Sequence, residues 1–290
     1  MAKAILLLSG GLDSTLVGKL LIDMGIEVEA INFISPFCRC TPKSLGCSAA
    51  QKTAKQLGIP VKVCAIGNDY LEIIKQPQFG RGKGMNPCLD CRIHFFSQAK
   101  EHMSASGADF IATGEVLGER PMSQRRCAME LIERKSGLMG LVLRPLSARL
   151  FPPTIPEKKH LVDRNRLLAI QGRCRKPQFE LAEKLGIKEY LCPAGGCLLT
   201  DPEFSVRFKD LLVHDPGFNL NDANLLKQGR HFRLPSGSKA VVGRNERENN
   251  VVESLAQSED ILLVPKDMPG GRVFFAVGLY HVMIYTSQRD

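Results

Sequence analysis

The chain has 290 residues, of which 44% are hydrophobic, and its 39 Lys and Arg against 30 Asp and Glu give a net charge of +9. This composition supports a sizeable core and excludes a largely disordered chain, while the cationic excess favours a polyanionic partner. The apolar runs fall short of the roughly 18 residues of a membrane span, and the N-terminus does not resemble a secretory signal. We therefore expect a cytoplasmic protein with no membrane partner, whose ten cysteines are reduced and serve metal binding or thiol chemistry.

Strands and helices are predicted to alternate through the first two thirds of the chain. Such alternation is typical of a doubly wound α/β fold with a parallel sheet, whose ligands bind at the carboxyl ends of the strands. A buried strand comes first, and a helix with apolar residues at helical spacing follows it. The expected strands are residues 4–8, 28–33, 61–66, 110–113 and 140–146, and the expected helices are 16–24, 48–57, 91–106, 163–171, 177–185 and 204–213.

The pattern changes near residue 200. Short strands are expected at 231–235, 239–243, 260–265, 273–278 and 281–286, with a helix near 246–257. We therefore expect two domains, an α/β domain over residues 1–200 and a small α+β domain over residues 201–290.

The most informative motif is Ser-Gly-Gly-Leu-Asp-Ser at residues 9–14, between the first strand and the first helix. Its glycines let the backbone approach a phosphate, and the helix N-terminus offers free N–H groups to the anion. Asp13 would repel a phosphate but is suited to holding Mg²⁺. The expected phosphate site comprises Ser9, Gly10, Gly11, Asp13 and Ser14.

This hexapeptide resembles the signature of the PP-loop ATP pyrophosphatases, also called adenine nucleotide alpha hydrolase-like domains. The resemblance implies that ATP and Mg²⁺ are cofactors, and that ATP is cleaved to AMP and pyrophosphate through an adenylated intermediate. The Gly-Lys-Ser/Thr ending of the Walker loop is absent.

Three groups of cysteines are candidate metal ligands. The two-residue gap between Cys88 and Cys91 lets both sulfurs turn toward one metal. The carboxyl-end rule places their loop, and the loop after the second strand, on the ATP side of the sheet. The other candidates are Cys192 and Cys197, within Cys-Pro-Ala-Gly-Gly-Cys, and Cys38, Cys40 and Cys47 after the second strand.

Residues 86–95 are similar to the Asn-Pro-Asp-x-x-Cys segment of bacterial tRNA 2-thiouridylases, in which the cysteine is catalytic. Cys91 matches that cysteine, and Cys88 replaces the acidic residue. A Cys-x-x-Cys here looks more like the iron–sulfur branch of tRNA thiolases, in which three cysteines hold a [4Fe–4S] cluster. Cys197 resembles the late cysteine of the thiouridylases and is the expected third ligand. Cys192 competes with it, while the Cys38, Cys40 and Cys47 group either supplies the third ligand or holds a second site with zinc.

The same resemblance extends the nucleotide and RNA sites. Gly114 lies where thiouridylases have a Thr-Gly-His segment that lines the ATP pocket, and Phe33, at the end of the second strand, is included in this site. Arg144 is expected to stabilise the departing pyrophosphate. Arg120, Gln124 and Arg125, and the cationic run at residues 171–176, are candidate phosphate or RNA contacts. Residues 243–250 look like the Gly-Arg-Asn segment of the NFACT RNA-binding domain, which implies that the tail holds tRNA.

The leading hypothesis is an ATP-dependent tRNA sulfurtransferase that adenylates a base carbonyl and replaces its oxygen with sulfur. Its catalytic residues would be Asp13, Cys88, Cys91 and Cys197, and sulfide or a cysteine desulfurase persulfide would donate the sulfur. Cys91 is the persulfide candidate if there is no cluster. One alternative is an amide- or nitrile-forming PP-loop synthase acting on a small molecule, with zinc on the cysteines. The other is a non-catalytic RNA-binding protein.

Overall fold

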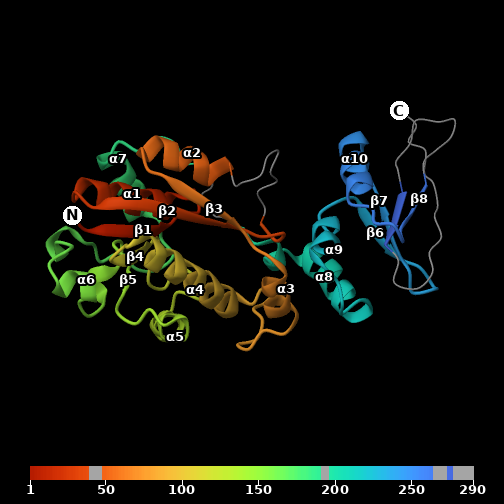
Figure 1. Ribbon diagram of the computed structural model, residues 1–290, viewed down its shortest axis with the longest axis horizontal. Coiled ribbons are helices and arrows are strands. Elements are labelled where there is room, and N and C mark those ends of the chain that lie inside the picture. Colours follow the sequence, from red (N-terminus) through yellow and green to blue (C-terminus); the bar gives the residue numbers. More distant parts are fainter. Residues whose placement is uncertain (39–47, 191–195, 264–272, 277–290) are drawn as a thin grey trace. The chain divides into compact units, whose positions relative to one another are not determined.

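The computed structural model describes residues 1–38, 48–190, 196–263 and 273–276, which fall into two compact units (Figure 1). The first unit comprises residues 1–82 and 87–196, and the second comprises residues 83–86 and 197–290. Each unit has its own sheet.

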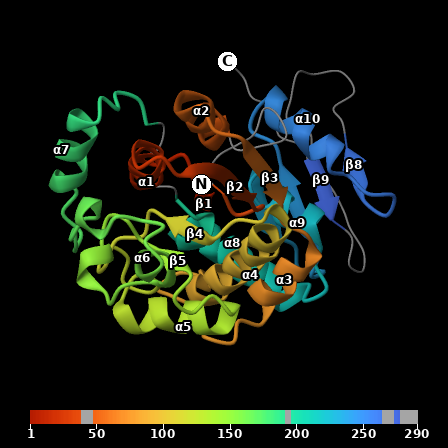
Figure 2. The same cartoon turned by 60° about the vertical axis from the view of Figure 1, so that its left-hand side comes forward.

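The first unit is built on a five-stranded parallel sheet with strand order β3-β2-β1-β4-β5. This confirms the predicted α/β class, and Figure 2 shows helices on both faces of the sheet. The strands are β1 (Lys3–Leu7), β2 (Glu27–Ile34), β3 (Val61–Ala65), β4 (Phe110–Thr113) and β5 (Val142–Leu143). The helices are α1 (Leu12–Asp23), α2 (Ser48–Leu57), α3 (Asn68–Lys75), α4 (Cys88–Ser106), α5 (Arg126–Ser136), α6 (Ile155–Lys158) and α7 (Lys176–Lys184), with 3-10 turns η1 (Ala148–Leu150) and η2 (Arg164–Arg166).

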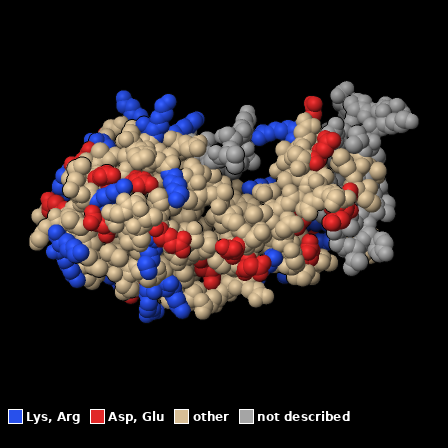
Figure 3. Space-filling model, in the orientation of Figure 1, with Lys and Arg blue, Asp and Glu red and all other residues tan. Residues whose placement is uncertain are grey.

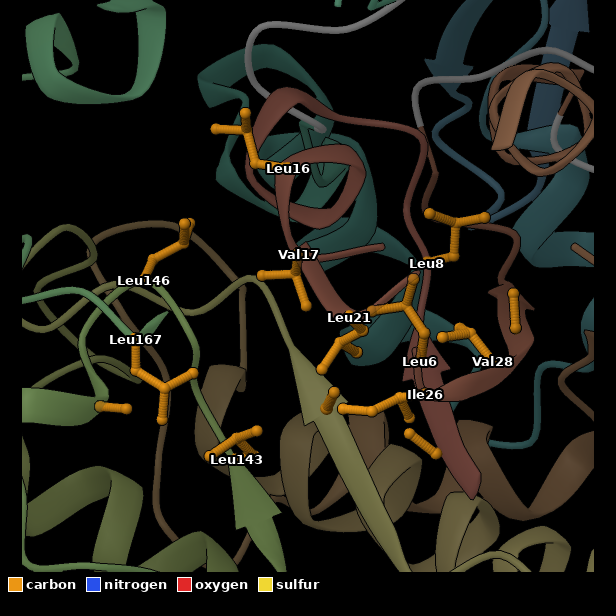
Figure 4. Close-up of a cluster of buried hydrophobic side chains, with 14 of the residues drawn as sticks. Leu6, Leu8, Leu16, Val17, Leu21, Ile26, Val28, Leu143, Leu146 and Leu167 are labelled. Atoms are coloured by element: carbon orange, nitrogen blue, oxygen red, sulfur yellow. The ribbon is translucent and has the colours of Figure 1, made fainter. Parts of the chain in front are cut away.

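Alternate residues of the central strands face two hydrophobic layers. Leu6 of β1 packs with Leu16 and Val17 of α1 in one layer (Figure 4). Ile5 points the other way and packs with Phe96 of α4. Because strands buried on both faces need apolar residues at every position, β1 is apolar without a break from Ala4 to Leu7 rather than alternating.

The helix expected at residues 163–171 is wrong apart from the short turn η2. Its second half is extended, because its backbone pairs with the segment that follows β5. Leu168 N donates to Pro145 O at 2.9 Å, and Ile170 N donates to Leu146 O at 2.8 Å. Apolar spacing alone did not distinguish this extended segment from a helix.

The second unit carries an antiparallel sheet with strand order β6-β7-β9-β8. Val241 of β7, Leu225 and Val252 form its small core, and Asn245 caps α10 by accepting from Glu248 N at 3.0 Å. Its elements are η3 (Leu198–Thr200), α8 (Pro202–His214), α9 (Leu220–Leu225), β6 (Arg230–Arg233), β7 (Lys239–Val242), α10 (Glu246–Ser254), β8 (Ile261–Leu263) and β9 (Val273–Ala276). The strand expected at 281–286 lies outside the described residues.

A four-residue segment from the middle of the chain belongs to this second unit. Met85 N donates to Leu199 O at 2.8 Å. A Cβ atom on Gly84 would come within 2.4 Å of that same carbonyl oxygen, so only glycine fits there. Residues 83–86 are thereby bound to η3, although they are distant from it in sequence.

His231 of β6 should make the stability of the second unit depend on pH. Its Nε2 lies 2.8 Å from Gln228 O, and its Nδ1 is buried with no hydrogen-bond partner among the described residues. Burial, aided by the charge of Lys239, lowers the pKa of His231 from 6.5 to about 3. Below pH 6.5 the unfolded chain therefore binds a proton that the folded chain rejects, and stability falls as the pH falls toward 3.

We expect the wild type to lose about 1.6 kcal/mol between pH 6.5 and pH 5 beyond the loss seen in His231→Gln, since the slope rises from half of its limit at pH 6.5 toward about 1.4 kcal/mol per pH unit. Glutamine keeps an N–H donor but does not titrate. Urea unfolding of the full chain at several pH values measures the difference. Equal pH dependence in both proteins would contradict the assignment.

Candidate functional site

The phosphate loop joins β1 to α1 and is folded tightly against its neighbours. Gly10 has a φ of +77°, and a Cβ atom on it would lie 2.6 Å from the backbone carbon of Ala49. Gly114, just after β4, is equally constrained, because a Cβ atom there would lie 2.6 Å from Ser14 N. The carboxyl ends of β1 and β4 are thus in contact, as the parallel sheet requires.

Hydroxyl groups fix the loop from within. Gly11 N donates to Ser9 Oγ at 3.3 Å, and Ser14 Oγ donates to Gly11 O at 3.0 Å. The two serine hydroxyls lie 3.2 Å apart. Gly11 is the extended N-cap residue of α1, so the first N–H groups of the helix face the loop without a side-chain cap. This arrangement is preorganised to receive an anion.

A polar cleft of about 90 Å³ opens beside this loop. Among the expected nucleotide residues, Ser9, Gly11, Asp13, Ser14 and Gly114 line it. Gly10 and Phe33 are not among the lining residues. The complete lining is Leu7, Ser9, Gly11, Asp13, Ser14, Arg92, Thr113, Gly114, Glu115, Glu119, Arg120, Gln124 and Arg175.

Four charged residues of this lining were not assigned to the phosphate site from sequence, namely Arg92, Glu115, Glu119 and Arg175. Arg92, Glu115 and Glu119 adjoin expected site residues along the chain, so proximity to Cys91, Gly114 and Arg120 was the available signal. Arg175 was expected only as part of a cationic run that contacts RNA, and nothing in the sequence paired it with the loop.

Two of the lining residues, Arg92 and Glu115, belong to an ion-pair group centred on the buried Arg144. Arg144 is 5% exposed; its Nε donates to Glu115 Oε2 at 3.1 Å, and its Nη1 donates to Glu133. Arg92 Nε lies 3.4 Å from the other oxygen of Glu115. Arg144 is not among the residues that line the cleft, and its expected contact with pyrophosphate stays a prediction. Arg92 is the cation that this group presents to the cleft.

Asp13 lies at the mouth of the loop in a mixed electrostatic environment. Burial raises the pKa of the Asp13 carboxyl, and the guanidinium groups of Arg175 and Arg120 oppose that rise. Arg175 Nη2 donates to Asp13 Oδ2 at 3.0 Å. The other oxygen, Oδ1, is buried with no hydrogen-bond partner in the described part of the chain. An orphaned carboxylate oxygen beside a phosphate loop fits a magnesium ligand.

Cys88 and Cys91 lie in the first turn of α4, and both are half-buried. The Sγ atom of Cys91 is 2.9 Å from the hydroxyl oxygen of Tyr70, which is 2% exposed. Tyr70 packs in a group of rings in which Phe33 stacks on Phe95 with centroids 5.1 Å apart. The place of Phe33 in the nucleotide site stays a prediction.

The other predicted ligands are less defined. Cys38 is half-buried, and its Sγ lies 3.5 Å from Ser35 N, whereas Cys197 is the residue before η3 in the second unit. Cys40, Cys47 and Cys192 lie outside the described residues. Within the described ranges, no three His, Cys, Asp or Glu side chains form a group able to hold a metal. The third ligand therefore stays a prediction.

Two family models match separate parts of the chain. Residues 2–134, which contain the phosphate loop and the Cys88–Cys91 pair, match the tRNA methyl transferase HUP domain. This part of the chain is thus similar to a HUP domain. Its parallel sheet and the contact of Gly114 with the phosphate loop agree with that match. Residues 229–281 match the NFACT protein RNA binding domain.

Similar proteins include tRNA-specific 2-thiouridylases. The protein of this name from Legionella pneumophila strain Paris is 23% identical over 99% of this chain and 77% of its own length. That from Sulfurimonas denitrificans is 32% identical over 40% of this chain and 36% of its own length. The structure of the U34-tRNA thiolase NcsA from Methanococcus maripaludis, described with its [4Fe–4S] cluster, aligns with a TM-score of 0.39 and 21% identity, covering 74% of this chain and 68% of that chain.

The surface charge is mixed. On the face of the molecule in Figure 3, the Lys and Arg side chains are interspersed with Asp and Glu rather than gathered in one patch. None of the helices in the described part of the chain has both the length and the apolar character that a membrane crossing requires. The net charge of +9 therefore does not by itself locate an RNA-binding surface, which has to be argued from individual residues.

Proposed function

We propose that this protein is an ATP-dependent tRNA sulfurtransferase that adenylates a base carbonyl of tRNA and replaces its oxygen with sulfur. The observation that carries the proposal is the position of α4. This one helix places Arg92 in the phosphate cleft and carries Cys88 and Cys91 in its first turn. The helix that carries the thiol pair thus also contributes a lining residue to the phosphate cleft, which supports sulfur transfer to a base adenylated there.

In the first half-reaction, the base carbonyl oxygen attacks the α-phosphorus of ATP and pyrophosphate leaves. The N–H groups at the start of α1 would bind the phosphates. Asp13 would hold Mg²⁺, which neutralises charge that develops on the phosphate oxygens. Arg92 and Arg120 add fixed positive charge to the cleft.

In the second half-reaction, a sulfur nucleophile attacks the same base carbon, the C–O bond breaks, and AMP leaves with the oxygen. Cys88 and Cys91 fit a cluster, because Cys-x-x-Cys thiolates are common iron–sulfur ligands. A [4Fe–4S] cluster held by these two residues and Cys197 would leave one iron open for sulfide. Without a cluster, Cys91 would carry the sulfur as a persulfide from a cysteine desulfurase. After its outer sulfur attacks the base, a second cysteine thiol would cleave the S–S bond, forming a disulfide with Cys91 and leaving the sulfur on the base.

The tRNA would be held in part by the second unit. Arg230 and Phe232 alternate on β6, an edge strand in the described sheet, and so share one face. Arg230 is exposed, and Phe232 is 50% exposed, which is unusual for a ring of this size. A cation beside an exposed aromatic ring is the arrangement on which unpaired RNA bases stack.

Phe232→Ala is expected to weaken tRNA binding about 5- to 100-fold, the loss that corresponds to removing one stacking platform. Arg230→Ala should reduce the slope of log affinity against log salt by about one. Lys209→Ala is the matched control, because Lys209 is an exposed cation on α8, outside residues 229–281 that match the RNA-binding domain. Fluorescence anisotropy with labelled tRNA across a salt series measures all three variants. Unchanged affinity in Phe232→Ala and Arg230→Ala would remove β6 from the RNA surface.

The proposed function is tested by nucleoside mass spectrometry of tRNA from cells that lack the protein. One thiolated nucleoside should disappear, and its unsulfurated parent should accumulate. It should return when purified protein, ATP and sulfide are added to that tRNA. An unchanged set of thiolated nucleosides would contradict the proposal.

A further inference from the structure

One cation in the phosphate cleft comes from a distant part of the chain. Arg175, the residue before α7, bonds to Asp13 at 3.0 Å, and its Nε lies 3.7 Å from Glu119 Oε1. None of these three side chains is more than 19% exposed. The guanidinium of Arg175 therefore lies between the carboxylates of Asp13 and Glu119, beside the phosphate loop. An incoming nucleotide would bring its own cation to this place.

The two carboxylates require a positive charge between them. Burial raises the pKa of Glu119, and the nearby charge of Asp13 raises it further. Removing Arg175 without a substitute would leave two partly buried like charges facing each other, which is costly. A divalent cation that arrives with ATP is such a substitute, since carboxylate oxygens are its preferred ligands. Arg175 and the cation would therefore compete for Asp13.

The segment that carries Arg175 faces both the cleft and the solvent. On the inner side, Gly172 N donates to Leu117 O at 2.7 Å, two residues before Glu119. On the outer side, Arg173 and Lys176 are exposed. Both are available to RNA phosphates, which bind Arg and Lys strongly. A polyanion held by the outer side chains would pull on the backbone that positions Arg175.

We propose that Arg175 is an internal counter-ion that blocks the phosphate loop until tRNA engages residues 171–176, so that tRNA binding and Mg·ATP binding favour each other. This inference rests on the proposed use of ATP and tRNA, and adds that the two bind cooperatively. Such coupling favours ATP binding in protein that also holds its RNA. Because coupling between two binding sites is reciprocal, ATP should also tighten tRNA binding.

The test measures Mg·ATP binding by calorimetry, with and without tRNA. Without tRNA, Arg175→Gln should bind Mg·ATP about two- to fivefold more tightly than the wild type, the factor that a partly exposed ion pair is worth. Added tRNA should tighten ATP binding to the wild type and have little effect on Arg175→Gln. The double substitution of Arg173 and Lys176 by Gln should reduce only the tRNA effect. Lys184→Gln, an exposed charge at the other end of α7, is the control and should match the wild type.

Weaker or unchanged Mg·ATP binding in Arg175→Gln would overturn the inference, because Arg175 would then be a phosphate ligand or a bystander. Tighter binding in Arg175→Gln combined with no tRNA effect on the wild type would overturn the coupling to RNA. Titration with Mn²⁺ alone, followed by electron paramagnetic resonance, keeps the two proposals separate. If no form of the protein binds ATP, the proposed function fails, and tighter Mn²⁺ binding by Arg175→Gln still decides whether Arg175 is a counter-ion.

Discussion

Asp13→Ala is expected to reduce pyrophosphate release by at least about 100-fold, the size of effect seen when one charge-stabilising group is removed from a preorganised site. Asp13 is an acidic residue of the first turn of α1, and its Oδ1 atom is buried with no hydrogen-bond partner among the described residues. The substitution removes the proposed magnesium ligand and leaves the Gly10 and Gly11 turn intact. A pyrophosphate release assay with tRNA present measures the effect.

The fold should survive this change. An acidic residue in the first turn stabilises a helix by only about 0.3–1 kcal/mol through the helix dipole. Asp23→Ala, at the last residue of the same helix, is the matched control and should retain normal release. Circular dichroism establishes that both variants are folded. Normal pyrophosphate release from folded Asp13→Ala protein would refute the adenylation chemistry.

The second large effect concerns the cysteines. Anaerobically purified protein is expected to be brown and to contain about four irons per chain, the content of one [4Fe–4S] cluster. Replacing Cys88, Cys91 or Cys197 by Ala should each remove the iron and the thiolation activity, because two thiolates do not retain such a cluster. Cys127→Ala is the control, since Cys127 is exposed on α5 and lies outside the three cysteine groups.

Each deviation from this pattern has a distinct meaning. Colourless, iron-free protein that still thiolates tRNA would leave the persulfide route on Cys91 in place. If Cys197→Ala keeps its iron while Cys192→Ala or Cys40→Ala loses it, the cluster is real and the assignment of Cys197 is wrong. Iron retained in Cys88→Ala and Cys91→Ala alike would refute the α4 site altogether.

The sequence was most informative where local chemistry determines the structure. The hexapeptide at residues 9–14 predicted the turn between β1 and α1, because glycines and a helix start have few other combined uses. The parallel sheet followed from alternating apolar strands and helices. Both features depend on residues that are close together in the chain.

Long-range contacts were not predictable in the same way. The bond between Arg175 and Asp13 joins residues 162 positions apart, and charge alone placed Arg175 on the RNA surface. Arg144 followed a strand end as expected, but its environment depends on Glu115 and Glu133, which approach only in the folded chain. The spacing of apolar residues cannot predict such contacts. It indicates which face of a helix or strand a residue occupies, but not which residue of another element packs against that face.

The segment at residues 83–86 has a consequence for how this protein can evolve. Because Met85 is hydrogen-bonded to Leu199, the backbone passes between the two units three times, before residue 83, after residue 86 and after residue 196. A single genetic crossover near residue 196 would combine residues 83–86 of one parent protein with residues 197–290 of another, although both segments belong to the second unit. Productive exchange of RNA-binding modules between relatives therefore requires a matched change at two distant places in the gene, with glycine retained at position 84. The two units should accordingly be inherited together.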